Sequence, residues 1–120
     1  MFKNKIDYKN IYNMYIYNET MNVDDAVHDE WLVWIKAHIP KVLSTGKFEK
    51  ATLTKVMVEE ELGGQTYSVQ YRSYSREALD AFYRDEAEKF QLEALKKFSD
   101  KMLTFKTELQ IVDEYTVNFK

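Results

Sequence analysis

Two kinds of periodicity alternate along this chain. Runs rich in β-branched and aromatic residues, such as "IYNMYIYNETMNV" at residues 11–23, predict strands. Runs with apolar residues three and four positions apart predict two amphipathic helices, one starting at Ala26 and one from Ser75 to about Ser99. The order is therefore strand, helix, strand, strand, helix, strand. The predicted strands cover residues 11–23, 47–60, 65–74 and 102–112.

Residues that start or stop helices and turns stand between these segments. The acidic pair at 24–25 suits the N-terminus of the first helix, and Ser75 suits that of the second. Pro40 lacks a backbone donor and its ring clashes one turn back, so we expect it to kink, restart or end the first helix. Gly46 stands where a C-terminal glycine belongs. The glycine pair at 63–64 supplies the positive φ angles that a hairpin turn needs.

This order predicts an α+β fold of the ferredoxin-like βαββαβ type. Right-handed crossovers would place both helices on one face of a four-stranded antiparallel sheet. The other face, called the open face below, is left without a helix. We expect a single domain over residues 11–120, with residues 1–10 as a flexible polar extension.

The charge and residue content exclude several classes of protein. A net charge of −3 gives no basic footprint, so we expect no nucleic-acid partner. No apolar run approaches the roughly 18 residues of a membrane span, so we expect no membrane contact. Cysteine is absent, and the sequence has no motif for a metal ion or a nucleotide, so we expect no metal and no cofactor. A cytoplasmic location is the default for such a chain.

Alternation along the strands predicts which side chains face the helices. In the last strand, Leu103, Phe105 and Leu109 are expected to face them, which leaves Lys106 and Glu108 on the open face. A mixed polar and apolar face of this kind commonly meets a partner, and a symmetric dimer is the commonest oligomer. We therefore expect a homodimer through the open face, a dimeric α/β barrel with room for a small ligand between its sheets. The residues expected on this face are Met14, Ile16, Asn18, Val56, Val58, Ser68, Gln70, Arg72, Lys106 and Glu108.

Polar side chains of the open face are candidates for a ligand site. Arg72 and Lys106 could bind an anion, and Glu108 could act as a base. Asn18 and Gln70 would add hydrogen-bonding groups. The charged residues could equally pair with one another or across a dimer, which is the structural interpretation that we favour.

Glu19 presents a separate problem. By alternation it faces the same side as Tyr17 and Met21, which is an awkward place for a carboxylate. If Glu19 is truly buried, its pKa should rise, and it becomes a candidate site residue. A bulge or an edge position would remove the conflict.

The stretch "HDEWLVWIKAHIP" at residues 28–40 holds both histidines and both tryptophans. His28 and His38 lie about 15 Å apart along a helix, so they cannot share a metal ion. Each could act alone as a catalytic base, or satisfy a neighbouring group structurally. Trp31 and Trp34 fall on the apolar side of the helix, where they could stack on a planar ligand or fill the core.

Several of these stretches resemble a family of short bacterial proteins known only as a domain of unknown function. The shared patterns over residues 14–112 are a Y-N-x-T-x-N-V strand, an H-x-x-W-x-x-W helix ending in H-I-P-x-x-L-x-T-G-x-F, a Y-x-V-Q-Y strand and an F-x-T-x-L strand. The resemblance implies a ferredoxin-like fold related to the dimeric α/β barrels, and it implies no assigned activity. Glu19 stands where members often carry an aliphatic residue. The most specific block comprises His38, Ile39, Pro40, Leu43, Thr45, Gly46 and Phe48.

Two hypotheses about function follow. The first is a non-catalytic homodimeric module that binds a small ligand between its sheets. The second is a small enzyme of the dimeric-barrel type, monooxygenase- or isomerase-like, that needs little or no cofactor. It would use His28 or His38 as base and Arg72 to hold an anionic intermediate. The two differ in whether a histidine opens into the same cavity as Arg72.

Overall fold

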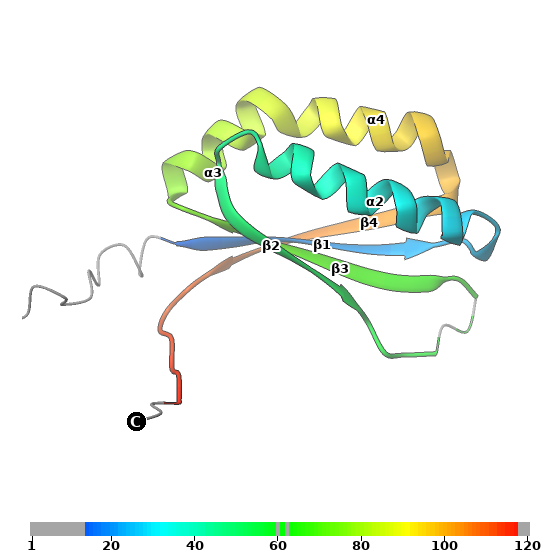
Figure 1. Ribbon diagram of the computed structural model, residues 1–120, viewed down its shortest axis with the longest axis horizontal. Helices are drawn as coiled ribbons and strands as arrows, with labels where there is room; N and C mark the ends of the chain where they lie inside the picture. The colour runs from blue at the N-terminus through cyan, green and yellow to red at the C-terminus, as the bar shows by residue number, and fades with distance from the viewer. Residues whose placement is uncertain (1–13, 60, 62, 118–120) are drawn as a thin grey trace, which may run out of the picture.

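The computed structural model describes residues 14–59, 61 and 63–117, and the predicted extension at residues 1–10 lies outside them. A four-stranded antiparallel sheet in the order β2-β3-β1-β4 carries the helices on one face (Figure 1). The predicted ferredoxin-like fold is confirmed. Its elements are β1 (Tyr15–Val23), α2 (His28–Leu43), β2 (Phe48–Lys55), β3 (Gln65–Ser73), α3 (Arg76–Phe82), α4 (Glu88–Phe98) and β4 (Met102–Gln110).

The predicted residues Asp24 and Ser75 both act as caps, although Asp24 caps the 3₁₀ turn before α2 and not α2 itself. The Asp24 carboxylate accepts a hydrogen bond of 2.8 Å from the Ala26 N–H, at the start of a 3₁₀ turn that leads into α2. The Ser75 hydroxyl oxygen accepts one of 3.0 Å from the Ala78 N–H at the start of α3. Each cap satisfies a backbone donor that the helix itself leaves free.

The hairpin between β2 and β3 confirms the role of the two glycines. Gly63 and Gly64 have φ angles of 84° and 82°. A Cβ atom on Gly64 would lie 2.8 Å from the Val23 carbonyl oxygen, so no larger residue fits there.

Pro40 does not end α2, and the prediction that it ends or restarts the helix is wrong. The helix continues to Leu43, and the Ser44 N–H donates to the Pro40 carbonyl over 2.9 Å. Proline removes one donor in the last turn, and the following residues still close their own hydrogen bonds.

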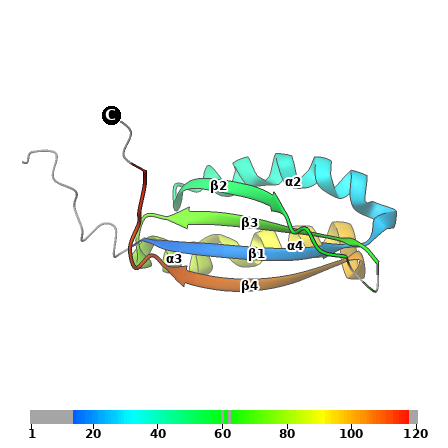
Figure 2. The ribbon, with the colours of Figure 1, turned by 90° about the horizontal axis from the view of Figure 1, so that it is seen from below.

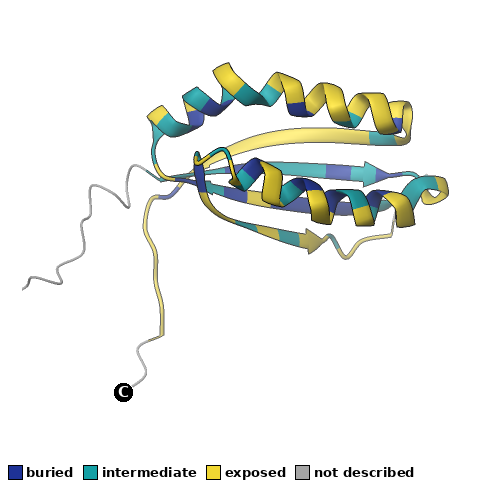
Figure 3. Ribbon diagram, turned by 45° about the horizontal axis from the view of Figure 1, so that its top comes forward, coloured by how far each residue is buried: buried dark blue, intermediate teal, exposed yellow. Residues whose placement is uncertain are grey.

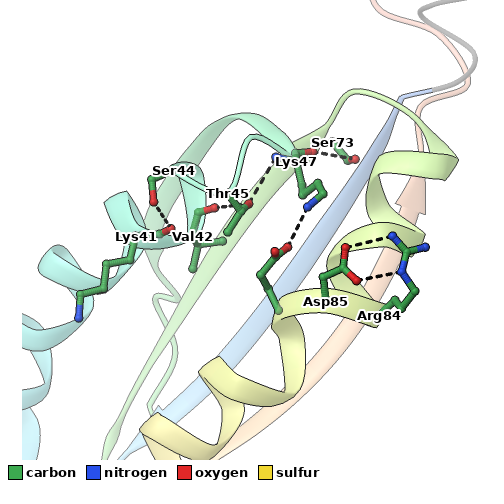
Figure 4. Close-up of polar contacts among 9 residues, drawn as sticks. Lys41, Val42, Ser44, Thr45, Lys47, Ser73, Arg84 and Asp85 are labelled. Carbon is green, nitrogen blue, oxygen red and sulfur yellow. Dashed lines mark hydrogen bonds and ion pairs between the residues drawn. The ribbon is translucent and has the colours of Figure 1, made fainter.

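The end of α2 is fixed by side chains that cap its last carbonyls (Figure 4). The Thr45 hydroxyl donates to the Val42 carbonyl over 2.7 Å, and its oxygen accepts the Lys47 N–H at 3.3 Å. Gly46 then takes the positive φ of 81° that lets the chain reverse. The Ser73 hydroxyl donates to the Lys47 carbonyl over 3.2 Å and so ties this turn to the end of β3.

The second predicted helix is interrupted. A π turn at Tyr83–Ala87 separates α3 from α4, and Ser99, with a φ of 52°, ends α4 near the predicted position. A π turn inserts one residue and rotates the helix that follows it. The Lys47 ammonium lies 3.0 Å from the Glu86 carboxylate and connects this turn to the end of α2 (Figure 4).

β2 is shorter than the strand predicted over residues 47–60. The regular pairs with β3 end at Lys55, but Val56 still donates its N–H to the Thr66 carbonyl of β3 over 2.9 Å, and Val58 donates to the Val56 carbonyl over 3.1 Å. Val56 therefore continues the open-face alternation of Thr52 and Thr54, whereas Val58 lies beyond the strand and its predicted place on the sheet is wrong. Residue 60 lies outside the described residues.

The two faces of β4 are the reverse of the prediction. Lys106 pairs with Glu19, and Glu108 pairs with Tyr17, on the face that carries the helices. Directly paired residues share a face, so Lys106 and Glu108 do not lie on the open face. Leu103, Phe105 and Leu109 lie there instead and are 57, 65 and 45% exposed. We call these three residues the β4 apolar strip. Alternation was correct, but β4 is an edge strand whose apolar side is turned away from the helices.

The core lies between the sheet and the helices, and it is unevenly filled. Four residues of α2 are buried, whereas α4 buries only Phe90 and Phe98. α4 and β4 are exposed along most of their length (Figure 3), and β4 lies at the edge of the sheet, largely beyond the helices (Figure 2). Within the described residues, no helix is long and apolar enough to cross a membrane.

Candidate functional site

A cavity of about 240 Å³ lies between the helices and the sheet. Its floor is formed by β1, β3 and β4, and its roof by α2 and α4. Most of its wall is aromatic or aliphatic, with a small number of polar groups among them, as is usual in small-molecule sites. Its lining residues are Tyr17, Glu19, Met21, Trp34, Ile35, His38, Val42, Tyr71, Phe82, Ala87, Phe90, Gln91, Ala94, Leu95, Ser99, Met102, Thr104 and Lys106.

Glu19 lies on the floor of this cavity. β1 pairs regularly on both sides of it, with Val69 of β3 and Lys106 of β4, so no bulge turns the side chain away. The Tyr17 hydroxyl donates to its Oε2 over 3.2 Å. Burial raises the pKa of the Glu19 carboxyl, although the Lys106 charge and the Tyr17 hydrogen bond act in the opposite direction. The neutral acid is therefore favoured compared with an exposed glutamate.

Tyr71 lies on β3 opposite Tyr17, diagonal to Glu19, and is completely buried. Its hydroxyl has no hydrogen-bond partner among the described residues. Burial, followed by the nearby Glu19 charge, raises the pKa of Tyr71, so the hydroxyl keeps its proton. A buried hydroxyl without a partner is uncommon and costly in a folded protein, and its presence in the wall of a cavity suggests an absent partner.

The roof over these polar groups is aromatic. The Trp34 and His38 rings stack, with centroids 4.4 Å apart and an interplanar angle of 16°. Phe90 meets His38 edge-on at 5.2 Å. Burial lowers the pKa of His38, which favours the neutral imidazole near neutral pH.

The cavity opens between α4 and β4. Five of its lining residues are exposed: Gln91, Leu95, Ser99, Thr104 and Lys106. Lys106 therefore stands at the mouth, Glu19 farther in, and Tyr71 farthest along the floor, in the order of their strands.

An ion-pair network lies close to this site, around the predicted residue Glu108. The Arg76 guanidinium contacts the Glu108 carboxylate at 2.9 Å, and the Tyr83 hydroxyl also donates to it. Arg76, followed by Tyr83, lowers the pKa of the Glu108 carboxyl. Glu108 is thus an ionised structural partner of α3 and the π turn, and it does not line the cavity.

His28 and Trp31 also lie outside the cavity lining. The His28 Nε2 is 2.7 Å from the Tyr67 hydroxyl, and its Nδ1 is 2.9 Å from the Asp29 carboxylate. Trp31 is fully buried, and its indole N–H donates to the Met102 sulfur over 3.0 Å. Both side chains have local partners, which matches the structural interpretation given above.

The predicted candidates Asn18, Gln70 and Arg72 do lie on the open face, opposite the cavity. The Ser68 hydroxyl donates to the Asn18 amide oxygen over 2.6 Å. Arg72 pairs with Glu49 at 2.9 Å and with Glu114 at 2.8 Å. Arg72 therefore does not line the cavity that contains His38, and three of the predicted residues, Trp34, His38 and Lys106, meet there together with Glu19.

Sequence reasoning missed Tyr71 as a site residue, although its inward alternation was recognised. The sequence does not show that the Tyr71 hydroxyl has no hydrogen-bond partner, because this depends on how the domain packs. Within the described part of the chain, no three His, Asp or Glu side chains gather as metal ligands.

Comparison with known proteins supports the fold and places the chain in a family. No curated protein matches the chain. A crystal structure of a dimeric ferredoxin-like protein from an uncultured marine organism is similar, with a TM-score of 0.69 at 12% identity, over 86% of this chain and 99% of that one. The model of the family described as "Domain of unknown function (DUF4286)" matches residues 14–112. The chain therefore belongs to the DUF4286 family.

Proposed function

We propose that this protein is a homodimeric module that binds a small molecule in the helix–sheet cavity of each subunit. The observation that carries the proposal is the polar row of Lys106, Glu19 and Tyr71 on the floor of a cavity with a largely aromatic and aliphatic wall. Burial of a carboxyl and of a hydroxyl without a partner costs stability, and groups of this kind in a cavity are candidates for a ligand site. The cavity is small compared with typical ligand pockets of about 300–1,000 Å³, so the ligand is compact.

The dimer is supported by the β4 apolar strip. Leu103, Phe105 and Leu109 line the open side of an edge strand, where a monomer would expose both apolar surface and unpaired backbone groups. The described end of the chain, residues 111–117, leaves the sheet on the side away from the helices (Figure 1). Val112 and Tyr115 in this segment are also exposed. The similar marine protein is described as dimeric.

Sedimentation velocity at micromolar concentration tests the dimer. Phe105→Glu places a charge in the strip and should yield a monomer. Val33→Glu is the matched control, because Val33 is an exposed apolar residue on α2, away from the open face. A wild-type monomer, or a Phe105→Glu protein that stays dimeric, would contradict the open-face interface.

Calorimetric titration tests the cavity. The probe is naphthamide, a compact and neutral aromatic amide. Ala94→Trp fills the cavity from α4 and should abolish binding, whereas Ala37→Trp on the exposed side of α2 should not change it. Binding that survives Ala94→Trp would place the ligand elsewhere and overturn the proposal.

A catalytic role for the same cavity is the second candidate, and His38 is the observation that favours it. Its imidazole is held neutral in the same cavity as Glu19, whose raised pKa favours the protonated carboxyl, so the cavity contains a base in its roof and an acid on its floor. Such a pair suits proton transfer of the isomerase type. A ligand that binds wild-type protein and exchanges a carbon-bound proton for deuterium only while His38 is present would support catalysis. Equal exchange in His38→Phe would exclude it.

A further inference from the structure

The charges of the cavity limit what its ligand can be. Glu19 and Lys106 are the only acidic or basic residues in its lining apart from His38, which is held neutral. Burial raises the pKa of the Glu19 carboxyl and disfavours its ionised form, which weakens the counter-charge that Glu19 offers to Lys106 at the mouth. Among the described residues Lys106 makes no ion pair within 4.0 Å.

The polar groups on the floor of the cavity can all donate hydrogen bonds. Lys106 offers an ammonium, Tyr71 offers a hydroxyl that has no partner, and a protonated Glu19 offers its O–H. Tyr17 already donates to the Glu19 Oε2, so in the protonated acid the other Glu19 oxygen is the one left to donate. A row of donors with one positive charge is a site for an anionic acceptor.

The rest of the cavity is suited to an aromatic ring system. Trp34, His38 and Phe90 form the roof, and Phe82 and Tyr17 close the inner end. The Tyr17 and Phe82 rings are 5.6 Å apart, and the His38 and Phe90 rings are 5.2 Å apart, so ring edges and faces both line the space. A ligand ring between these groups makes the offset and edge-on contacts that aromatic pairs prefer.

We infer that the cavity binds a compact aromatic carboxylate, with its carboxylate between Lys106, Glu19 and Tyr71 and its ring under Trp34 and His38. This inference rests on the proposed ligand-binding function and names its ligand class. The ligand carboxylate supplies the missing partner of Tyr71 and the missing counter-charge of Lys106. Glu19 takes part as a neutral acid that donates a charge-assisted hydrogen bond.

Two other head groups fit these residues less well. An ammonium group would face Lys106 and would require Glu19 to ionise in a partly buried place. A neutral amide satisfies Tyr71 but leaves the Lys106 charge unpaired. The order of affinity should therefore be carboxylate, amide and ammonium.

The experiment is a calorimetric comparison of three probes that share one ring: naphthoate, naphthamide and naphthylmethylammonium. Full-length wild-type protein should bind naphthoate at least about tenfold more tightly than naphthamide, and the ammonium more weakly still. Naphthamide that binds as tightly as naphthoate, or a preference for the ammonium, overturns the ligand class and leaves the cavity function intact. No binding of any probe overturns both.

Substitution of Lys106 identifies the contact. Lys106→Met should remove the preference for naphthoate over naphthamide, with little effect on naphthamide itself. Lys50→Met is the matched control, because Lys50 is an exposed lysine on the opposite edge strand, paired with Arg72 on the open face. An unchanged preference in Lys106→Met, or an equal loss in Lys50→Met, contradicts the proposed pairing.

The pH dependence identifies the role of Glu19. The titratable groups that line the cavity with it are Tyr17, Tyr71, His38 and Lys106. Naphthoate affinity should fall as pH rises through the elevated pKa of Glu19, because the ionised carboxylate repels the ligand. Glu19→Gln keeps a donor but cannot ionise, so it should bind naphthoate without that fall. The same fall in Glu19→Gln would contradict a donating Glu19.

Discussion

Helices α2 and α4 cover the same face of the sheet, but they pack on it differently. α2 buries Trp31 and Ile35 against the sheet, whereas α4 leaves Leu92 and Leu95 55 and 56% exposed. The cavity lies under α4.

The strands on the two sides of the sheet explain this contrast. β3 presents Tyr67, Val69 and Tyr71 to the helices, and all three are buried. β4 presents Thr104, Lys106 and Glu108, which are exposed and cannot form a core with α4. One side of the domain thus supplies stability, and the other keeps space and polar groups that a fully packed core would exclude.

The largest difference in stability is expected between alanine variants of the two tryptophans. Trp31→Ala should lower the free energy of unfolding by about 3–5 kcal/mol, because it empties a sealed part of the core. Trp34→Ala should cost about 2 kcal/mol or less, because its ring already borders a cavity. Urea unfolding followed by circular dichroism measures both. Equal costs would show that the two sides are packed alike.

Added volume should have opposite effects under the two helices. Ala51→Leu enlarges a β2 side chain packed against the core, and should destabilise by about 1–3 kcal/mol. Ala94→Leu extends into the cavity and should be neutral or stabilise by up to about 1 kcal/mol. Thermal unfolding distinguishes them, and a destabilised Ala94→Leu protein would argue against open space under α4.

Glu19 should make stability fall with rising pH. Its pKa is raised by burial in the folded state, so the folded protein binds more protons than the unfolded one. The contribution of Glu19 to the free energy of unfolding is complete below its pKa in the unfolded protein, about 4.3. It is lost as the pH rises through the pKa of Glu19 in the folded protein. In Glu19→Gln this decline should be missing, as urea unfolding over a pH series would reveal. A decline of the same size in both proteins would be inconsistent with a raised pKa.

His38 should make stability fall as the pH is lowered, which is the opposite of the effect of Glu19. Burial lowers the pKa of His38, so its contribution is present above the unfolded pKa of about 6.5 and is lost as pH falls through the folded pKa. His38→Phe should remove this acid-side loss. The same pH series measures it, and an unchanged acid-side slope would contradict a neutral, buried imidazole.

The smallest effects are expected at the exposed ion pairs. Arg76→Met breaks the contacts with Glu108 and Asp80 and should cost about 0.5–1 kcal/mol. Arg84→Met removes the exposed pair with Asp85 and should produce no measurable change in the melting temperature. Calorimetry measures the melting temperature of both variants. A lower melting temperature for Arg84→Met than for Arg76→Met would contradict this ranking.

Local signals in the sequence predicted most of the fold because they act over a few residues. Asp24, Ser75 and Gly46 set the ends of the helices, and the glycine pair at 63–64 sets the hairpin. Pro40 was misinterpreted, because a single missing donor in a last turn does not stop a helix.

The candidate site was only partly predictable. Alternation placed Glu19 on the helix side, and the amphipathic pattern placed Trp34 and His38 in the first helix. Alternation gives two sets of side chains along β4, but it does not say which set faces the helices, so Lys106 was assigned to the wrong face. That choice depends on register with β1 and on the partner of the apolar strip, and neither is a local property.

The methionine methyl groups offer the most direct test of the cavity under α4. Met21 and Met102 line it, whereas Met14 and Met57 lie outside its lining. In an NMR titration of methyl-labelled protein with naphthoate, the Met21 and Met102 signals should shift together along a single binding curve, and the Met57 signal should stay in place. Shifts confined to Met14 or Met57, or unchanged Met21 and Met102 signals at saturating naphthoate, would contradict a ligand site between α4 and the sheet.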